Sequence, residues 1–157
     1  MSSRQDNFFE AVAARQIPRI RVAGIVVHDG AVLVQKPTDD ADACYAFIGG
    51  EYETGDTFES RLKKEFEEET NATVLHSTYL FCVENHFEYK GMPIQQIEHY
   101  FDVTLDRADI ESLEDHLMQY WLPLADLQDY DLRPLVVRDA LQSGTYLDVK
   151  RMTQAGN

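Results

Sequence analysis

The sequence predicts an α/β domain in which helices pack on a mixed β-sheet. Three observations support this fold class. Runs rich in β-branched and aromatic residues are bounded by turn signals such as Asp29-Gly30. Residues 58–69 carry apolar side chains at helical spacing. Residues 132–144 form a second candidate helix, because a proline stands near its start and a glycine at its end.

The elements before the first helix are predicted from turn residues and short apolar runs. Residues 19–37 contain two β-branched runs joined by Asp29-Gly30, the strongest short hairpin signal, and Pro37 ends the second run. Residues 45–48 are a short apolar stretch ahead of two glycines. We therefore expect a hairpin, a loop and a brief strand in this part of the chain.

The second half of the chain predicts long strands. Residues 72–89 and 93–105 are rich in aromatic and β-branched side chains and flank the turn signal Lys90-Gly91. Residues 118–124 have the composition of another strand. These segments supply most of the expected sheet.

The end of the chain predicts one more helix and a polar tail. Pro134 suits the first turn of a helix over residues 132–144, and Gly144 suits its C-cap. Residues 148–157 are polar, and we expect them to fray. The sequence contains no internal repeat, low-complexity tract or linker, so we expect residues 1–157 to form a single domain.

The composition limits the function classes. Fourteen basic and 28 acidic residues give a net charge of −14, which opposes non-specific binding to a nucleic acid polymer or an anionic membrane. The chain start lacks an apolar signal segment and no apolar run is long enough to span a bilayer, so we expect a cytoplasmic protein. The two cysteines, Cys44 and Cys82, indicate neither a disulfide framework nor a zinc site.

Four carboxylates crowd into two turns of the helix over residues 58–69. At about 100° per residue, Glu68 and Glu69 lie about 60° behind and about 40° ahead of Glu65, whereas Glu67 lies about 200° away. Such crowding costs free energy through like-charge repulsion unless solvent or a cation screens it. The cluster is therefore either a solvated acidic face or a metal site.

The apolar stripe of the same helix bears on this choice. Its centre lies only about 65° from the centre of the three converging carboxylates, so they stand beside the buried edge of the helix. The stripe consists of Phe58, Leu62 and Phe66. A compensating cation is expected there, and clustered oxygen ligands favour Mg²⁺ or Mn²⁺. In a chain this acidic, the spacing alone leaves a solvated face equally open.

Another acidic segment does not fit a metal loop. A calcium-binding EF-hand loop starting at Asp40 and Asp42 would need an oxygen ligand and a glycine where Cys44 and Tyr45 stand. This site is rejected.

The segment 50–72 resembles the Nudix box, GX5EX7REUXEEXGU with U aliphatic, of hydrolases that cleave nucleoside diphosphates linked to another moiety. In this register the box positions are occupied, in order, by Gly50, Asp56, Lys64, Glu65, Phe66, Glu68, Glu69, Asn71 and Ala72. The preceding Gly49, and Glu53 within the loop, also match the common form of the family. The order of the predicted elements over the whole chain is similar to the Nudix α/β/α sandwich with its mixed sheet.

The sequence departs from the box at four positions. Asp56 stands for Glu, Lys64 for Arg and Asn71 for Gly, and Ile48 stands where many members have a proline. In the family the Arg usually pairs with the first Glu, so the resemblance implies a weaker clamp between Asp56 and Lys64 here. A competing interpretation gives Asp56 and Glu59 to a capping box at the helix start.

The resemblance implies the metal ligands and the reaction. Glu65, Glu68 and Glu69 would bind one or more Mg²⁺ or Mn²⁺, with Glu53 or the carbonyl of Gly50 as further ligands. The metal would bridge pyrophosphate oxygens and lower the pKa of an attacking water, while a carboxylate takes its proton.

Further roles are assigned to individual residues on the same basis. Glu68 is the first candidate for the general base, and Glu98 and Glu84 are alternatives. Lys64, at the Arg position, and Glu65 complete the predicted catalytic set. The candidate substrate-binding residues are Tyr45, Glu53, Arg61 and Glu98. Weaker candidates for contacts with a base or phosphate are Tyr89, Lys36 and Lys90.

The sequence therefore predicts a metal-dependent pyrophosphohydrolase acting on a small nucleotide derivative. The alternative is a Nudix scaffold with a loosened box that binds a nucleotide as a sensor or interaction module. No subfamily signature assigns the substrate. Homodimers are common in the family, so a homodimer is one expected assembly.

Overall fold

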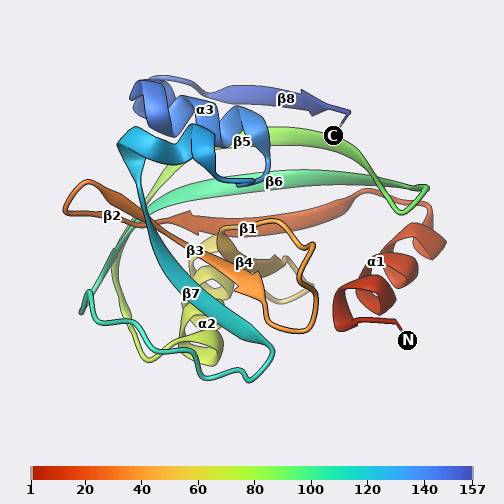
Figure 1. The fold of residues 1–157 in the computed structure, drawn as a ribbon, viewed down its shortest axis with the longest axis horizontal. Coiled ribbons are helices and arrows are strands. Elements are labelled where there is room, and N and C mark those ends of the chain that lie inside the picture. The colour runs from red at the N-terminus through yellow and green to blue at the C-terminus, as the bar shows by residue number, and fades with distance from the viewer. Residues whose placement is uncertain (1, 157) are drawn as a thin grey trace.

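The computed structural model describes residues 2–156. Its first half contains α1 (Arg4–Arg15), β1 (Arg19–Ile25), β2 (Val27–His28), β3 (Ala31–Pro37), β4 (Ile48–Glu51) and α2 (Phe58–Glu69). Its second half contains β5 (Val74–Tyr89), β6 (Met92–Leu105), β7 (Leu117–Pro123), the 3-10 helix η1 (Leu124–Asp129), α3 (Leu135–Ser143), the 3-10 helix η2 (Thr145–Leu147) and β8 (Arg151–Ala155). Figure 1 shows α2 and α3 on opposite sides of the larger sheet. The α/β fold class is confirmed. No helix in the described range is long and apolar enough to cross a membrane.

The larger sheet has five strands in the order β4-β1-β6-β5-β8. Strand β1 pairs antiparallel with β4 and parallel with β6, so the sheet is mixed, as expected. Strands β5 and β6 form the predicted long hairpin, and both turn residues, Lys90 and Gly91, have positive φ. Because β1 lies between β4 and β6, it brings the strand with the two glycines close to the long hairpin.

The turn at Asp29-Gly30 closes a shorter hairpin than the sequence predicted. Both residues have positive φ, 50° and 74°, as a type I′ turn requires. Strand β2 has only two residues and pairs with β3, whereas β1 pairs with β4 and β6. The chain leaves the larger sheet near Val26 and enters a separate antiparallel sheet of order β2-β3-β7. One continuous hairpin over residues 19–37 is therefore wrong.

The strand before α2 lies later than predicted. Tyr45 and Ala46 make only isolated bridges, and β4 includes Gly50 of the box and the preceding Gly49. A Cβ at Gly49 would overlap with the backbone of Val22 on β1. Glycine is required there because the two strands approach each other closely.

Both ends of the described chain form elements that the sequence analysis did not predict. Helix α1 begins with a capping box between Ser3 and Asp6, and its Phe9 packs on Phe87 and Tyr89 near the turn of the long hairpin (Figure 1). Residues 151–155 form β8, parallel to β5, so the expected fraying is wrong there. Backbone pairing with the open edge of β5 holds this strand, together with the contact of Met152 with the core.

Buried side chains form two clusters, one on each face of the larger sheet. Ala23 belongs to the cluster that contains Val137 of α3. Its neighbour Val22 belongs to the cluster that contains Leu62 and Phe66 of α2, both 0% exposed. The predicted apolar stripe therefore faces the sheet and fixes the direction of the carboxylates of α2.

Candidate active site

Helix α2 begins at a capping box between Thr57 and Ser60. The Thr57 hydroxyl accepts the amide of Ser60 at 3.0 Å, and the Ser60 hydroxyl accepts the amide of Thr57 at 2.9 Å. The capping box proposed for Asp56 and Glu59 is therefore wrong. Asp56 lies outside the helix and is free to bind another partner.

That partner is Arg61, which is buried on the first turn of α2. Its guanidinium donates to both oxygens of Asp56, at 2.7 and 3.2 Å, and to Glu65 Oε1 at 3.0 Å. The Asp56 carboxylate also accepts the amide of Glu53 at 2.8 Å. These contacts, led by Arg61, hold the pKa of Asp56 below its usual value. Arg61 therefore ties the loop of residues 53–56 to the helix.

Lys64 does not form the predicted clamp. Its side chain is 56% exposed, and its ammonium lies 3.9 Å from Glu68, a weak i,i+4 pair. The function expected of the pair at positions 56 and 64 is carried by Arg61, three residues earlier. Arg61 was a candidate phosphate ligand in the sequence analysis, but in the structure its charge is neutralised by carboxylates.

Glu65 and Glu69 form a crowded carboxylate pair beside β3 and β4. Burial raises the pKa of both groups, and that of Glu69 reaches about 7. A neighbouring carboxylate raises each pKa further, and for Glu69 this neighbour is Glu65. Gln35 of β3 donates to Glu69 at 3.1 Å. Any Cβ at Gly50 would overlap with the Glu65 carboxylate, so the glycine leaves the space that this group occupies.

Three other glutamates, Glu53, Glu67 and Glu68, point to solvent. Glu67 and Glu68 are exposed, and the Glu53 side chain is 62% exposed at 3.6 Å from Arg61. Among residues 2–156, no three His, Cys, Asp or Glu side chains are already grouped to hold a metal ion. Glu65 and Glu69 offer the carboxylate oxygens that a hard cation prefers, and the charge of Glu65 raises the pKa of Glu69 even though Arg61 binds Glu65. A third ligand requires the exposed Glu68 to turn, or the carbonyl of Gly50.

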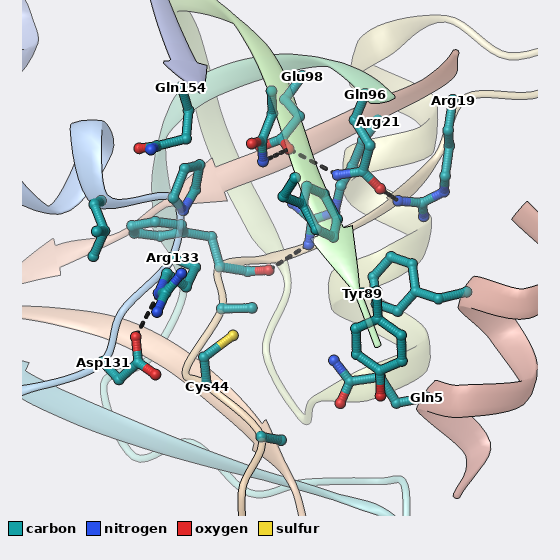
Figure 2. A pocket seen from close by; sticks show the side chains of 18 of the residues that line it. Gln5, Arg19, Arg21, Cys44, Tyr89, Gln96, Glu98, Asp131, Arg133 and Gln154 are labelled. Atoms are coloured by element: carbon teal, nitrogen blue, oxygen red, sulfur yellow. Dashed lines mark hydrogen bonds and ion pairs between the residues drawn. The ribbon is translucent and has the colours of Figure 1, made fainter. Parts of the chain in front are cut away.

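A cavity of about 500 Å³ lies between the larger sheet, α1 and the loops that follow β3 and η1 (Figure 2). Gly49 belongs to its wall, next to the glycine that contacts Glu65. Figure 2 shows Arg19, Arg21, Gln96 and Glu98 along one side and Gln5 and Tyr89 on another. The cavity volume is typical of sites for small molecules.

A buried polar network forms the sheet side of the cavity. Arg19 donates to Gln96 Oε1 at 2.8 Å, and Gln96 donates to Glu98 Oε2 at 2.7 Å. Asn85 donates to the same oxygen at 2.8 Å, and Tyr100 donates to Glu98 Oε1. Glu98 is only 2% exposed, so a built network rather than solvent satisfies its carboxylate.

Arg21 connects the cavity to the carboxylates of α2. It lies beside Glu98 in the β1–β6 register and donates to the carbonyl of Phe47 at 2.6 Å. Its positive charge also opposes the upward pKa shifts of Glu65 and Glu69. The sequence analysis missed Arg21, although Arg19 and Arg21 alternate on one face of a predicted strand, which is a signal for a cationic patch.

The other predicted residues are dispersed. Tyr45 packs edge-to-face on Tyr120 and Tyr130 and does not line the cavity. Lys36 lies 5.1 Å above the Tyr45 ring. Glu84 pairs with Arg151 at 3.4 Å and is absent from the cavity wall. The cavity does include the remaining two candidates, Tyr89 and Lys90.

Solved structures with a similar fold include MutT proteins. The chain matches a structure from a study of MutT of Aliivibrio salmonicida and Vibrio cholerae with 21% identity and a TM-score of 0.63, over 82% of this chain and 99% of that one. It matches the MutT Nudix hydrolase of Burkholderia pseudomallei with 21% identity and a TM-score of 0.63, over 81% and 98%. It matches the MutT protein of Methanosarcina mazei Go1 with 20% identity and a TM-score of 0.65, over 82% and 94%. These likenesses show the fold.

The comparison of sequences identifies the family. No curated protein matches the chain. The profile of the NUDIX domain matches residues 18–140, a range that contains the box, Arg61 and most of the cavity wall but excludes α1 and β8. The chain belongs to the Nudix family.

Proposed function

We propose that this protein is a metal-dependent pyrophosphohydrolase that cleaves a nucleoside diphosphate linked to another moiety. One observation carries the proposal: the Glu65–Glu69 pair and the cavity lie on either side of the two glycines of β4. A phosphate chain can then reach from the cavity toward the carboxylates past side-chain-free backbone.

Glu65 and Glu69 are the proposed ligands of Mg²⁺ or Mn²⁺, with Glu68 and the carbonyl of Gly50 completing the set. When bound, the cation would neutralise pyrophosphate oxygens and lower the pKa of a water molecule. The upward pKa shifts of Glu65 and Glu69 support the assignment, because buried, mutually repelling carboxylates bind a cation at the expense of a proton.

Arg61 is proposed to position Glu65. It holds one carboxylate oxygen at 3.0 Å while Asp56 holds the guanidinium from the other side. This leaves the second oxygen of Glu65 for a cation. The role assigned to Lys64 in the sequence analysis passes to Arg61, and Lys64 keeps only its weak pairing with Glu68.

The reaction would break one bridging P–O bond as a water oxygen bonds to phosphorus. Glu68 is the proposed acceptor of the water's proton, because its carboxylate is exposed and its ion pair with Lys64 is long, at 3.9 Å. Glu98 is less suited, since Asn85, Gln96 and Tyr100 already donate to its two oxygens. We assign Glu98 to substrate binding together with Arg19 and Arg21.

A substrate screen tests the proposal. ADP-ribose, dinucleoside polyphosphates, nucleotide sugars and nucleoside triphosphates are incubated with the protein and Mg²⁺ or Mn²⁺, and the phosphate products are resolved by chromatography. Metal-dependent release of a nucleoside monophosphate is the expected result. No turnover with any compound would overturn it.

The second candidate is a nucleotide-binding module. It is favoured by the arrangement of two proposed metal ligands. Arg61 already binds Glu65. Glu68 is exposed, and its carboxylate lies 3.9 Å from the Lys64 ammonium. A binding module would give a nucleotide-induced rise in melting temperature without turnover. The same screen therefore separates the two candidates.

A further inference from the structure

Two amide side chains in the cavity wall carry a buried oxygen without a hydrogen-bond partner. In residues 2–156, four buried side-chain oxygens have none, and they belong to Gln5, Asn85, Gln119 and Gln142. Gln5 of α1 and Asn85 of β5 both line the cavity, from different walls, whereas Gln119 and Gln142 do not. Two of these four oxygens therefore belong to residues that line the cavity.

The orientation of the Asn85 amide is fixed by its neighbours. Because Arg19 can only donate, the Gln96 side-chain oxygen faces Arg19 and the Gln96 NH₂ group faces Glu98. The Glu98 carboxylate only accepts, so it holds the NH₂ of Asn85 at 2.8 Å. Flipping the amide would set oxygen against oxygen. The Asn85 Oδ1 is thus a fixed acceptor at the end of the network.

An unpaired acceptor at this position is costly. Asn85 is only 7% exposed, and a buried polar group without a partner costs about 1–3 kcal/mol. The network built around Glu98 gains nothing from leaving the oxygen unpaired. A ligand group that donates a hydrogen bond would remove this cost. A group that only accepts would not.

The cavity walls indicate what kind of molecule carries that donor. Aromatic rings contribute to several walls, namely Phe8, Phe47, Phe87, Tyr89 and Tyr100. Flat aromatic walls favour a planar ring, because rings stack and pack edge-to-face on one another. The Gln5 amide has no fixed partner for its oxygen and can turn to meet either a donor or an acceptor.

We infer that Asn85 determines specificity by accepting a hydrogen bond from the amino group of a planar heterocycle, the base of the substrate. The inference rests on the proposed function, which concerns the phosphates of the substrate, and extends that function to the base. Adenine, guanine and cytosine carry such an amino group. Analogues that lack only this group are the discriminating ligands.

Three pairs of nucleoside triphosphates test the inference in the full-length protein. They are ATP with purine riboside triphosphate, GTP with ITP, and CTP with the triphosphate of 2-pyrimidinone riboside. In at least one pair, we expect kcat/KM to favour the amino-bearing member by about tenfold or more. Equal values within all three pairs would overturn the inference without any variant.

Variants connect the preference to Asn85. Asn85→Leu and Asn85→Ala both remove the acceptor, and Asn85→Ala adds no bulk. In each variant, the ratio of the two kcat/KM values within the preferred pair should be close to one. The matched control is Gln142→Leu, which removes another unpaired buried oxygen, on α3 and away from the cavity. It should keep the wild-type ratio. A preserved ratio in a folded Asn85 variant would contradict the assignment.

Binding measured without turnover separates this inference from the proposed function. The shift of melting temperature by each triphosphate with Mg²⁺ reports ligand affinity. If no compound is hydrolysed but the amino-bearing member stabilises the protein more, the hydrolase proposal fails and the Asn85 assignment stands. If compounds are hydrolysed with no preference within any pair, the hydrolase proposal stands and the Asn85 assignment fails.

Discussion

Arg61 binds both carboxylate oxygens of Asp56 and, with its remaining terminal nitrogen, one oxygen of Glu65. The guanidinium is buried between the loop and the helix, so three charged groups share one desolvated position. Removing one partner from such a cluster leaves the other charges uncompensated. The arrangement makes Arg61 the residue on which both the loop and Glu65 depend.

We predict that Arg61→Leu lowers the free energy of unfolding by about 3 kcal/mol, because it leaves Asp56 and Glu65 without their cation. Arg61→Lys should recover only part of the lost free energy of unfolding, because an ammonium group cannot bind both oxygens of Asp56 in the way a guanidinium does. Denaturant unfolding monitored by fluorescence measures both values. Lys64→Leu is the matched control and should change stability by less than about 0.5 kcal/mol, because Lys64 is exposed.

A double-mutant cycle distinguishes the two pairings directly. Asp56→Ala combined with Arg61→Leu should be coupled, whereas Asp56→Ala combined with Lys64→Leu should be additive. Coupling of Asp56 with Lys64 would restore the clamp predicted from the sequence and contradict the observed contacts.

We predict that Glu65→Gln, Glu68→Gln and Glu69→Gln each reduce turnover strongly, with Glu68→Gln losing about 10²–10⁴-fold if it accepts the proton. An amide keeps the shape of each side chain but removes the charge that binds the cation. Steady-state kinetics on the substrate found in the screen measures these losses.

Glu67→Gln is the control for these substitutions, because Glu67 is an exposed residue of the same helix. It should behave as wild type. A loss in Glu67→Gln as large as the others would show that net charge, rather than the position of the carboxylates, controls activity.

The contribution of Glu69 to the free energy of unfolding of the metal-free protein should fall as pH rises from about 4.5 to about 7. The pKa of Glu69 is raised from 4.5 to about 7, first by burial and then by Glu65. Between these values the folded protein binds more protons than the unfolded chain, so raising the pH favours unfolding. Below this window the carboxyl is protonated in both states. Unfolding measured across this range in wild type and Glu69→Gln gives the contribution of Glu69, which the amide should abolish.

Mg²⁺ should oppose this trend. A cation that binds the ionised carboxylates stabilises the folded protein by mass action, and more so at higher pH. The melting temperature at pH 8 should therefore rise with Mg²⁺ in wild type and much less in Glu69→Gln. A melting temperature that is independent of Mg²⁺ would count against the proposed site.

The sequence predicted those features that depend on residues close together in the chain. The turn at Lys90-Gly91 requires positive φ, and the apolar residues of α2 repeat at helical spacing, so both were found without tertiary information. The Arg61–Glu65 pair was also within reach, because an i,i+4 spacing of opposite charges is visible in the sequence. The resemblance to the box drew attention to Lys64 instead.

The features that were missed depend on segments far apart in the chain. Asn85 meets Glu98 only because the register of the long hairpin sets Asn85 opposite Gln96. Strand β8 forms on an edge left open by β5 and carries no apolar pattern of its own. The capping box of α1 is a local signal, but its place beside the cavity follows from contacts with the hairpin turn.

The last prediction concerns the attachment of α1. Asp6 accepts the Tyr89 hydroxyl at 2.7 Å and pairs with Lys90 at 2.6 Å, while Val12 is the one buried residue of the helix. Polar contacts at the turn of the long hairpin therefore contribute much of the attachment. We predict that Asp6→Asn increases hydrogen exchange of the α1 amides several-fold, with little change in the central strands.

The sign of the pH effect follows from the same contacts. The Lys90 ammonium, followed by the Tyr89 hydroxyl, lowers the pKa of Asp6 below its ordinary value of 3.8. The stabilisation is therefore complete above that value and is lost as the pH falls through the lower pKa of the folded state. Acid should lower the protection factors of the α1 amides in wild type, that is, the ratio of the intrinsic to the observed exchange rate at each pH, toward the values of Asp6→Asn. Glu10→Gln, which removes an exposed carboxylate from the same helix, should leave exchange unchanged at every pH. Equal exchange in Asp6→Asn and Glu10→Gln would mean that the aromatic contact of Phe9 with Tyr89, rather than the ion pair, holds α1 against the cavity.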